Sequence, residues 1–175
     1  MKRLIILSVV MLIINGCTVK VRTVYDHQTD FKKYKNFCWL GNCEFIFKGP
    51  DFMKDSLIKE KIQRAIKSEM KKKGINFNSE SPDLLMDVQV VLKTDTAYIY
   101  HQPDDEYSLL PFASPEKVLM LKGTLVIAMV DQKAGKMVWR SVAVSYFDLH
   151  PDLSEENFSK GVASALKEFP PKSSK

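Results

Sequence analysis

The 175-residue sequence is poor in glycine, histidine and cysteine, and each scarcity excludes a class of chemistry. Its seven glycines include neither a phosphate-binding loop nor the G-x-S-x-G elbow of serine hydrolases. Its three histidines provide no H-E-x-x-H zinc motif. Two of the three cysteines are spaced C-x4-C, and without a second cysteine or histidine pair this is a poor zinc signal. The common signatures of hydrolases, nucleotide-binding enzymes and zinc proteins are therefore missing.

Only one long apolar run is present, and it is too short to persist as a membrane span. Lys2 and Arg3 precede the apolar residues 4–14, and polar and charged residues follow soon afterwards. A transmembrane helix needs about 20 apolar residues. A positive end, a short apolar stretch and a small-residue cleavage site are instead typical of an export signal. We therefore expect residues 1–16 to be removed as a signal peptide.

The residues that close this run resemble the lipobox of bacterial lipoproteins. Ile14, Asn15 and Gly16 place a branched apolar residue and a small residue before Cys17. The resemblance implies a diacylglycerol thioether on the Cys17 sulfur and an acyl chain on its new amino group, and several acyl chains hold a protein stably on a bilayer. By analogy with lipoprotein sorting, Thr18 at the next position implies the outer membrane. The alternative is an ordinary signal peptide with a chance cysteine.

The chain that remains after cleavage is expected to form one domain without a bound cofactor. Removal of 16 of the 175 residues leaves 159, which suits a single hydrophobic core. Loss of Lys2 and Arg3 lowers the formal charge from +5 to +3, too mild a charge to favour nucleic acid as a partner. We expect a tether over residues 17–20, an α+β domain over 21–171 and a disordered tail over 172–175.

The apolar patterns predict an α+β fold with an antiparallel sheet of about four to five strands and two main helices packed on one face. Alternation predicts strands over residues 19–25, 37–40, 84–94 with a continuation toward 100, 118–131 and 137–147. Helical spacing predicts helices over 52–73 and 154–169. The 118–131 strand is apolar on both faces, which predicts a central position. A sheet of this kind needs a second cover, so we expect a partner or self-association surface opposite the helices.

Cys38 and Cys43 lie on either side of the turn signal Gly41-Asn42. An oxidising compartment permits a disulfide between them. The bridge would close a very small loop and stabilise the fold by about 2 kcal/mol at best. Two buried thiols are the alternative interpretation.

Two further groups of residues are candidates for contacts with other molecules. The partner-surface candidates are Tyr98, Tyr100, Leu109, Leu110 and Phe112. They would contact an envelope protein or a second copy of the chain, unless they complete the core. The metal-site candidates are His101, Asp104, Asp105 and Glu106. An imidazole and hard carboxylates can share a divalent ion, but an acidic loop beside a chance histidine is the competing interpretation. We therefore expect a non-catalytic binding or structural role, with a hydrolytic or metal-dependent enzyme using residues 101–106 as the alternative.

Several motifs taken together resemble the bacterial lipoprotein family catalogued as domain of unknown function 4136. They are Phe31-x-x-Tyr34-Lys35-x-Phe37-x-Trp39-Leu40, Ser81-Pro82-Asp83-Leu84-Leu85, Gly123-Thr124-Leu125-Val126-Ile127, Asp131-x-x-x-Gly135-Lys136-x-Val138-Trp139-Arg140 and Phe169-Pro170-Pro171. The resemblance covers nearly the whole mature chain and implies an envelope location and an α+β fold. It supplies no catalytic residues. Cys38, Cys43 and the long loop after Tyr100 look like departures from the family.

Overall fold

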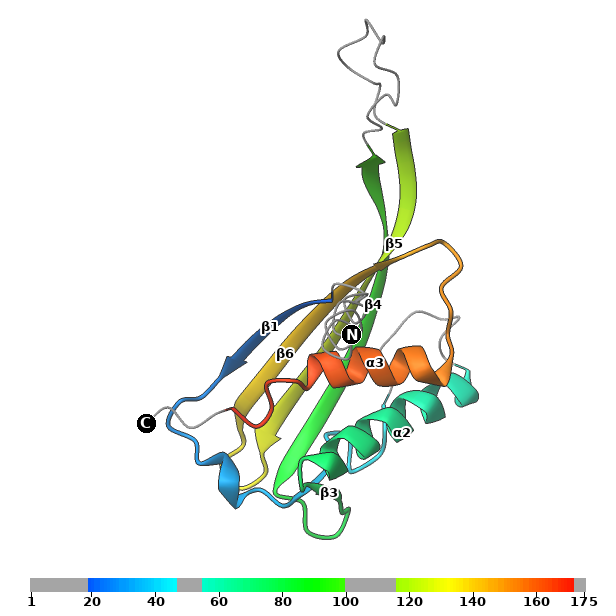
Figure 1. Cartoon of the computed structure of the whole chain (residues 1–175). Helices are drawn as coiled ribbons and strands as arrows, with labels where there is room; N and C mark the ends of the chain where they lie inside the picture. The colour runs from blue at the N-terminus through cyan, green and yellow to red at the C-terminus, as the bar shows by residue number, and fades with distance from the viewer. Residues whose placement is uncertain (1–18, 47–54, 100–115, 172–175) are drawn as a thin grey trace, which may run out of the picture.

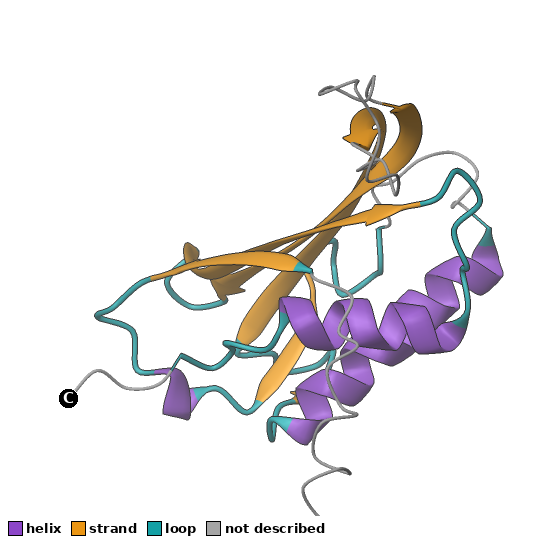
Figure 2. Cartoon of the chain, turned by 45° about the horizontal axis from the view of Figure 1, so that its top comes forward, coloured by secondary structure: helices purple, strands orange, loops and turns teal. Residues whose placement is uncertain are grey.

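A computed structural model describes residues 19–46, 55–99 and 116–171, which form a twisted sheet with two helices on one face (Figures 1 and 2). The strands are β1 (Lys20–Tyr25), β2 (Asn36–Trp39), β3 (Asn76–Phe77), β4 (Leu84–Ile99), β5 (Glu116–Asp131) and β6 (Lys136–Phe147). The helices are α2 (Ser56–Lys72), α3 (Glu155–Ala165) and the short 3-10 helix η1 (Phe31–Lys33). The α+β class and the placement of the two main helices agree with the sequence patterns.

The sheet has six strands of mixed direction, so the predicted antiparallel sheet of four to five strands is wrong. The strand order is β1-β6-β5-β4-β2-β3, and β2 runs parallel to both β4 and β3. The chain leaves β2, passes through α2 on one face and returns in the same direction, as a crossover connection between parallel strands requires. Strand β3 has only two residues, too few for alternation to reveal it.

Helix α2 forms where a capping residue, an apolar stripe and a terminating glycine follow one another. The Asp55 side chain accepts a hydrogen bond from the Leu57 backbone N–H at 2.7 Å, which satisfies one free donor of the first turn. One face of the helix buries Ile62, Ala65, Ile66 and Met70. Gly74 follows with a backbone φ of 78°, a conformation that favours glycine after a helix. The predicted start at residue 52 lies outside the described residues.

Helix α3 is shorter than its apolar spacing suggested. The Ser154 side chain caps its start by accepting from the Asn157 backbone N–H at 3.4 Å. The helix ends at Ala165, although the spacing predicted helix as far as Phe169. Phe169 instead packs its ring against Trp139, with centroids 5.1 Å apart, and is 1% exposed. Tertiary packing therefore takes this residue out of the helix.

Strand alternation divides the sheet into two unlike faces. On the covered face, which packs against α2 and α3, side chains of three neighbouring strands are almost completely buried: Leu84, Met86, Val88, Ile127, Met129, Trp139 and Ala143. Burial of each large apolar side chain stabilises the fold by about 1.5–3 kcal/mol. The opposite side, which we call the open face, carries the residues between them along each strand. The hydrophobic core thus lies between the helices and the covered face.

A buried carboxylate joins the end of β5 to the chain before β2. Asp131 is 5% exposed. Its Oδ2 accepts hydrogen bonds from Lys33 Nζ and Tyr34 Oη, both at 2.8 Å. Its Oδ1 accepts from the backbone N–H groups of Lys133 and Ala134, both at 2.9 Å. Four donors therefore hold this carboxylate and fix the β5–β6 turn.

These contacts shift the pKa values of Asp131 and Tyr34. The hydrogen bond from the Lys33 ammonium, followed by that from the Ala134 backbone, holds the pKa of Asp131 well below its usual range. Burial, followed by the hydrogen bond to Asp131, raises the pKa of Tyr34 to about 12. Asp131 is therefore charged and Tyr34 neutral throughout the physiological pH range.

Replacement of this carboxylate should destabilise the fold in a pH-dependent way. We expect Asp131→Asn to lower the free energy of unfolding near neutral pH by about 2 kcal/mol, because hydrogen bonds to charged groups contribute roughly 1.5–3 kcal/mol each. Since the native pKa of Asp131 lies below its unfolded value of about 3.9, the carboxylate stabilises fully above about pH 5 and progressively less as pH falls. Urea unfolding at several pH values should show that the difference in free energy of unfolding between wild type and variant becomes smaller as the pH falls below about 5.

The exposed Asp148→Asn provides the matched control, and it should change the free energy of unfolding by less than about 0.5 kcal/mol. If the difference in free energy of unfolding between wild type and Asp131→Asn stayed constant down to about pH 3, this would contradict the assignment of Asp131 as a carboxylate with a lowered pKa.

Candidate functional site

The structure places only three of the residues singled out from the sequence. Cys38, Cys43 and Tyr98 lie within the described segments. The lipidation candidate Cys17 and both loop groups lie outside the described residues: Tyr100, His101, Asp104, Asp105, Glu106, Leu109, Leu110 and Phe112. Tyr98 is 58% exposed and is not among the residues of the core, and its role as a partner contact stays a prediction.

A disulfide joins Cys38 to Cys43, with Cα atoms 5.0 Å apart. Cys38 is fully buried at the end of β2, on the side away from the main core. The intervening turn uses Asn42, whose φ of 51° is a left-handed conformation that asparagine tolerates better than most residues. The turn and its bridge therefore cap the open-face side of β2.

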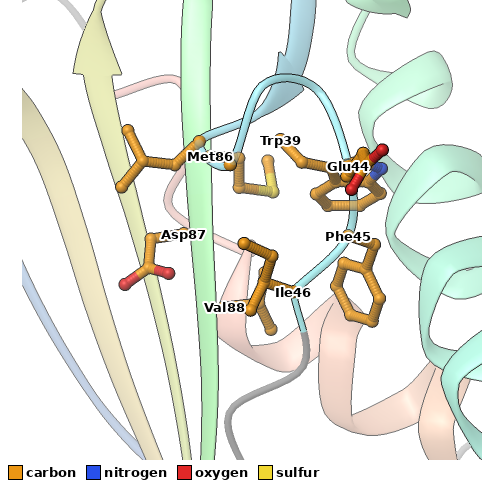
Figure 3. Close-up of a pocket in the computed structure, with 9 residues that line it drawn as sticks. Trp39, Glu44, Phe45, Ile46, Met86, Asp87 and Val88 are labelled. Carbon is orange, nitrogen blue, oxygen red and sulfur yellow. The ribbon is translucent and has the colours of Figure 1, made fainter.

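The segment after β2 forms a small pocket with the start of β4 (Figure 3). Trp39 contributes from the end of β2, Phe45 and Ile46 contribute from the segment after it, and Met86 and Val88 contribute from β4. The pocket holds about 120 Å³. Because pockets for small-molecule ligands usually measure roughly 300–1,000 Å³, this one is too small to enclose a substrate of ordinary size. A second pocket, of about 240 Å³ beside Met137 and Lys136, also lies below that range.

Neither a metal centre nor a membrane-spanning helix is found in the described part of the chain. Within residues 19–46, 55–99 and 116–171, no three His, Cys, Asp or Glu side chains lie together in a way that could hold a metal ion. None of the helices in these segments is both long and apolar enough to cross a bilayer.

The most extensive candidate site is the open face of the sheet. It is formed by Lys20, Arg22, Val24, Leu85, Asp87, Gln89, Val91, Lys93, Lys122, Thr124, Val126, Ala128, Val130, Met137, Arg140, Val142, Val144 and Tyr146. None of the described helices covers this face (Figure 2). Val142 of β6 pairs with Val126 of β5, and a row across three strands runs from Val144 of β6 through Thr124 of β5 to Val91 of β4. The result is an apolar centre that is only half-buried.

Exposed apolar side chains extend this centre toward its margins. Val24 is 55% exposed, Val91 40%, Met137 49% and Tyr146 45%. Single exposed apolar residues are ordinary on protein surfaces, but a continuous apolar patch marks an interaction site. The face can therefore bind an apolar surface across the open side of the twisted sheet.

Basic side chains border the apolar centre of the open face. Lys20 and Arg22 of β1 lie on one margin, and Lys93 and Lys122 lie beside each other toward the far end of β4 and β5. Arg140 lies between Val24 and Ala128. The acids on this face are fewer, namely Asp87, which accepts from Gln89 Nε2 at 2.8 Å, and Asp95 just beyond the margin. A partner with an apolar centre and an acidic border would complement this face.

Residues 21–171 match the family described as "Domain of unknown function (DUF4136)". The chain belongs to this family. The match covers both main helices and all six strands, apart from Lys20, the first residue of β1. No curated protein matches the chain at a significant level. Membership in DUF4136 therefore establishes ancestry and leaves the activity to be inferred from the molecule.

Among solved structures, the chain is similar to a PDZ domain protein from Parabacteroides distasonis, with 17% sequence identity and a TM-score of 0.57. That likeness covers 94% of this chain but only 39% of the Parabacteroides protein, and it concerns the fold alone. The chain is also similar to a PelC dodecamer subunit from Paraburkholderia phytofirmans, with 9% identity and a TM-score of 0.48 over 85% of this chain and 96% of that one.

Sequence reasoning missed two features that the fold assembles. Asp131 appeared only as part of a family motif, because its donors Lys33 and Tyr34 are nearly 100 residues away in sequence. The basic border of the open face was also missed, since Arg22, Arg140 and Lys122 come from three strands. The alternation within each strand could have indicated the shared face, but only with the pairing register in hand.

Loss of the Cys38–Cys43 bridge should lower the free energy of unfolding modestly. We expect Cys43→Ala to cost about 2 kcal/mol or less, because the bridge closes a very short loop. Urea unfolding with and without reductant measures the effect. Reductant should lower the free energy of unfolding of the wild type and leave that of Cys43→Ala unchanged. If reductant lowered the free energy of unfolding of both proteins equally, the disulfide would not be the cause of the loss.

Proposed function

We propose that this chain is a lipid-anchored lipoprotein of the bacterial cell envelope, sorted to the outer membrane, whose domain acts as a non-catalytic binding module.

 The observation that carries the proposal is the apolar open face, which no described helix covers and beside which the pocket at Val24 and Met137 holds only about 240 Å³. Platforms of this kind bind other macromolecules rather than enclose a small substrate. The domain would thus work by holding a partner at the membrane surface.

The N-terminal sequence supports the membrane anchor. Lys2, Arg3 and the apolar run before Gly16 and Cys17 have the order of a lipoprotein export signal. Only Thr18 and Val19 separate Cys17 from the first residue of β1. Three residue steps span at most about 11 Å even when fully extended. An acylated Cys17 would therefore keep the sheet close to the bilayer surface.

The disulfide and the arrangement of the sheet agree with an exported binding module. A disulfide such as Cys38–Cys43 persists in oxidising compartments outside the cytoplasm. The edge strand β1, which follows the anchor directly, contributes Lys20, Arg22 and Val24 to the open face. The anchor would thus place this face beside other components of the envelope, among them an envelope protein or a second copy of the chain.

Replacement of the anchoring cysteine tests the first half of the proposal. We expect mass spectrometry of the wild-type protein to show a chain that begins at Cys17 and carries diacylglycerol and an additional acyl group. Cys17→Ser should lose the lipid and leave the membrane fraction, because the thioether needs the sulfur. Cys43→Ala is the matched control and should keep both the lipid and the membrane fractionation. An unmodified Cys17 in the wild-type protein would refute the anchor.

Site-specific crosslinking in intact envelopes tests the second half. A photo-crosslinking amino acid at Val142, in the apolar centre of the open face, should capture a discrete partner. The same amino acid at Lys71, exposed on α2, should capture far less. Equal capture at the two positions, or none at Val142, would show that the open face is not the binding surface.

A further inference from the structure

One edge of β4 has no neighbouring strand in the described part of the chain beyond Met86. Strand β2 pairs with β4 only from Leu84 to Met86, whereas β4 continues to Ile99 with β5 on its other side. The Met86 carbonyl accepts from the Leu40 backbone N–H on this side, at 2.9 Å. Because backbone groups alternate along a strand, the even-numbered residues of β4 after Met86 direct their N–H and C=O groups to the same edge.

The far ends of β4 and β5 leave the body of the sheet as a two-stranded arm (Figure 1). Strand β6 ends at Phe147, opposite Leu121, so the pairs beyond Leu121 have no third strand among the described residues. Two side chains of this arm are largely exposed, Tyr98 at 58% and Leu119 at 51%. A two-stranded ribbon is marginally stable in water, and a further strand stabilises it. The open edge of β4 is where such a strand can pair.

We propose that a second copy of this chain supplies that strand, by antiparallel pairing of β4 with the partner's β4 about a twofold axis at Thr94. In this register Thr94 lies opposite the partner's Thr94, Leu92 opposite the partner's Thr96, and Val90 opposite the partner's Tyr98. All of these residues direct their backbone groups to the open edge, so each pair can exchange two hydrogen bonds. The Thr96 N–H donates to Asp95 Oδ1 at 2.9 Å within the single chain and exchanges that acceptor for the partner's Leu92 carbonyl on pairing. The interface is isologous, the commonest kind in homodimers.

The charges on β4 select this register. With the axis at Thr94, Lys93 lies opposite the partner's Asp95 in both halves of the interface. Within one chain Lys93 instead lies directly opposite Lys122, and opposed like charges destabilise a strand pair. A shift of the axis to Lys93 or to Asp95 would oppose two lysines or two aspartates. Of the three adjacent axes at Lys93, Thr94 and Asp95, only the one at Thr94 brings opposite charges together.

The neighbouring side chains and strands are compatible with the same pairing. On the open face, Val91 lies opposite the partner's Ala97, which places two apolar side chains together. Strand β2 contacts β4 only at residues 84–86, outside the paired segment 90–98. The two open faces and the two helical layers would each continue on the same side of a joint sheet. This inference goes beyond the proposed function, because it concerns the sheet edge and requires no lipid.

Disulfide trapping reads the register directly. Directly opposed residues of a hydrogen-bonded pair have Cα atoms about 5.5 Å apart, within the range of about 4.4–6.8 Å that a disulfide needs. In the full chain expressed in its envelope, Thr94→Cys should therefore form a product of twice the monomer mass under mild oxidation. Gln132→Cys, exposed at the opposite end of β5, is the matched control and should not. No excess of dimer over this control, or a product with a different protein, would overturn the proposal.

A charge exchange tests the ion pairs independently. In full chain purified in detergent, Lys93→Asp and Asp95→Lys should each weaken dimerisation at least about tenfold, and the double variant should recover to within about threefold of wild type. Lys93→Asp places opposite charges across β4 and β5 within one chain, so its melting temperature should not fall. Analytical ultracentrifugation measures the dissociation constant of the dimer, and circular dichroism measures the melting temperature. A double variant as weak as the single variants would refute the register, whatever the state of Cys17.

Discussion

Both main helices of this fold lie on the same face of the sheet, and the central strands of the sheet are apolar on both faces. Strand β5 buries Ile127 and Met129 against the helices and directs Val126 and Val130 to the other side. Because α2 and α3 lie together on the covered face, the second apolar surface has no described cover within the chain. The surface that we propose as a binding site follows from this imbalance.

The junction around Asp131 explains why residues far apart in sequence recur in one motif set. The carboxylate receives donors from η1, from Tyr34 before β2 and from the β5–β6 turn. It thereby joins the parallel and antiparallel halves of the sheet at one end. The motifs that contain Lys35, Gly135 and their neighbours thus meet at a structural joint.

The candidate site was predictable only in part. Alternation in residues 118–131 predicted a strand apolar on both faces, and hence a surface opposite the helices. The basic border could not be predicted, because Arg22 and Arg140 become neighbours of the apolar centre only through the pairing of β1 with β6 and β6 with β5. The unpaired edge of β4 could not be predicted from the sequence either, because it depends on the residue at which the pairing of β2 with β4 ends.

The sequence by itself determined the elements whose signals are local. Alternation and capping placed the long strands and the two main helices, whereas the export signal at the N-terminus stays a prediction. Tertiary structure alone decided that β2 is parallel to β4, that β3 exists, and that Phe169 leaves its helix to pack on Trp139. Periodicity reports which side of an element is apolar, whereas strand direction, neighbours and edges depend on contacts between residues distant in the chain.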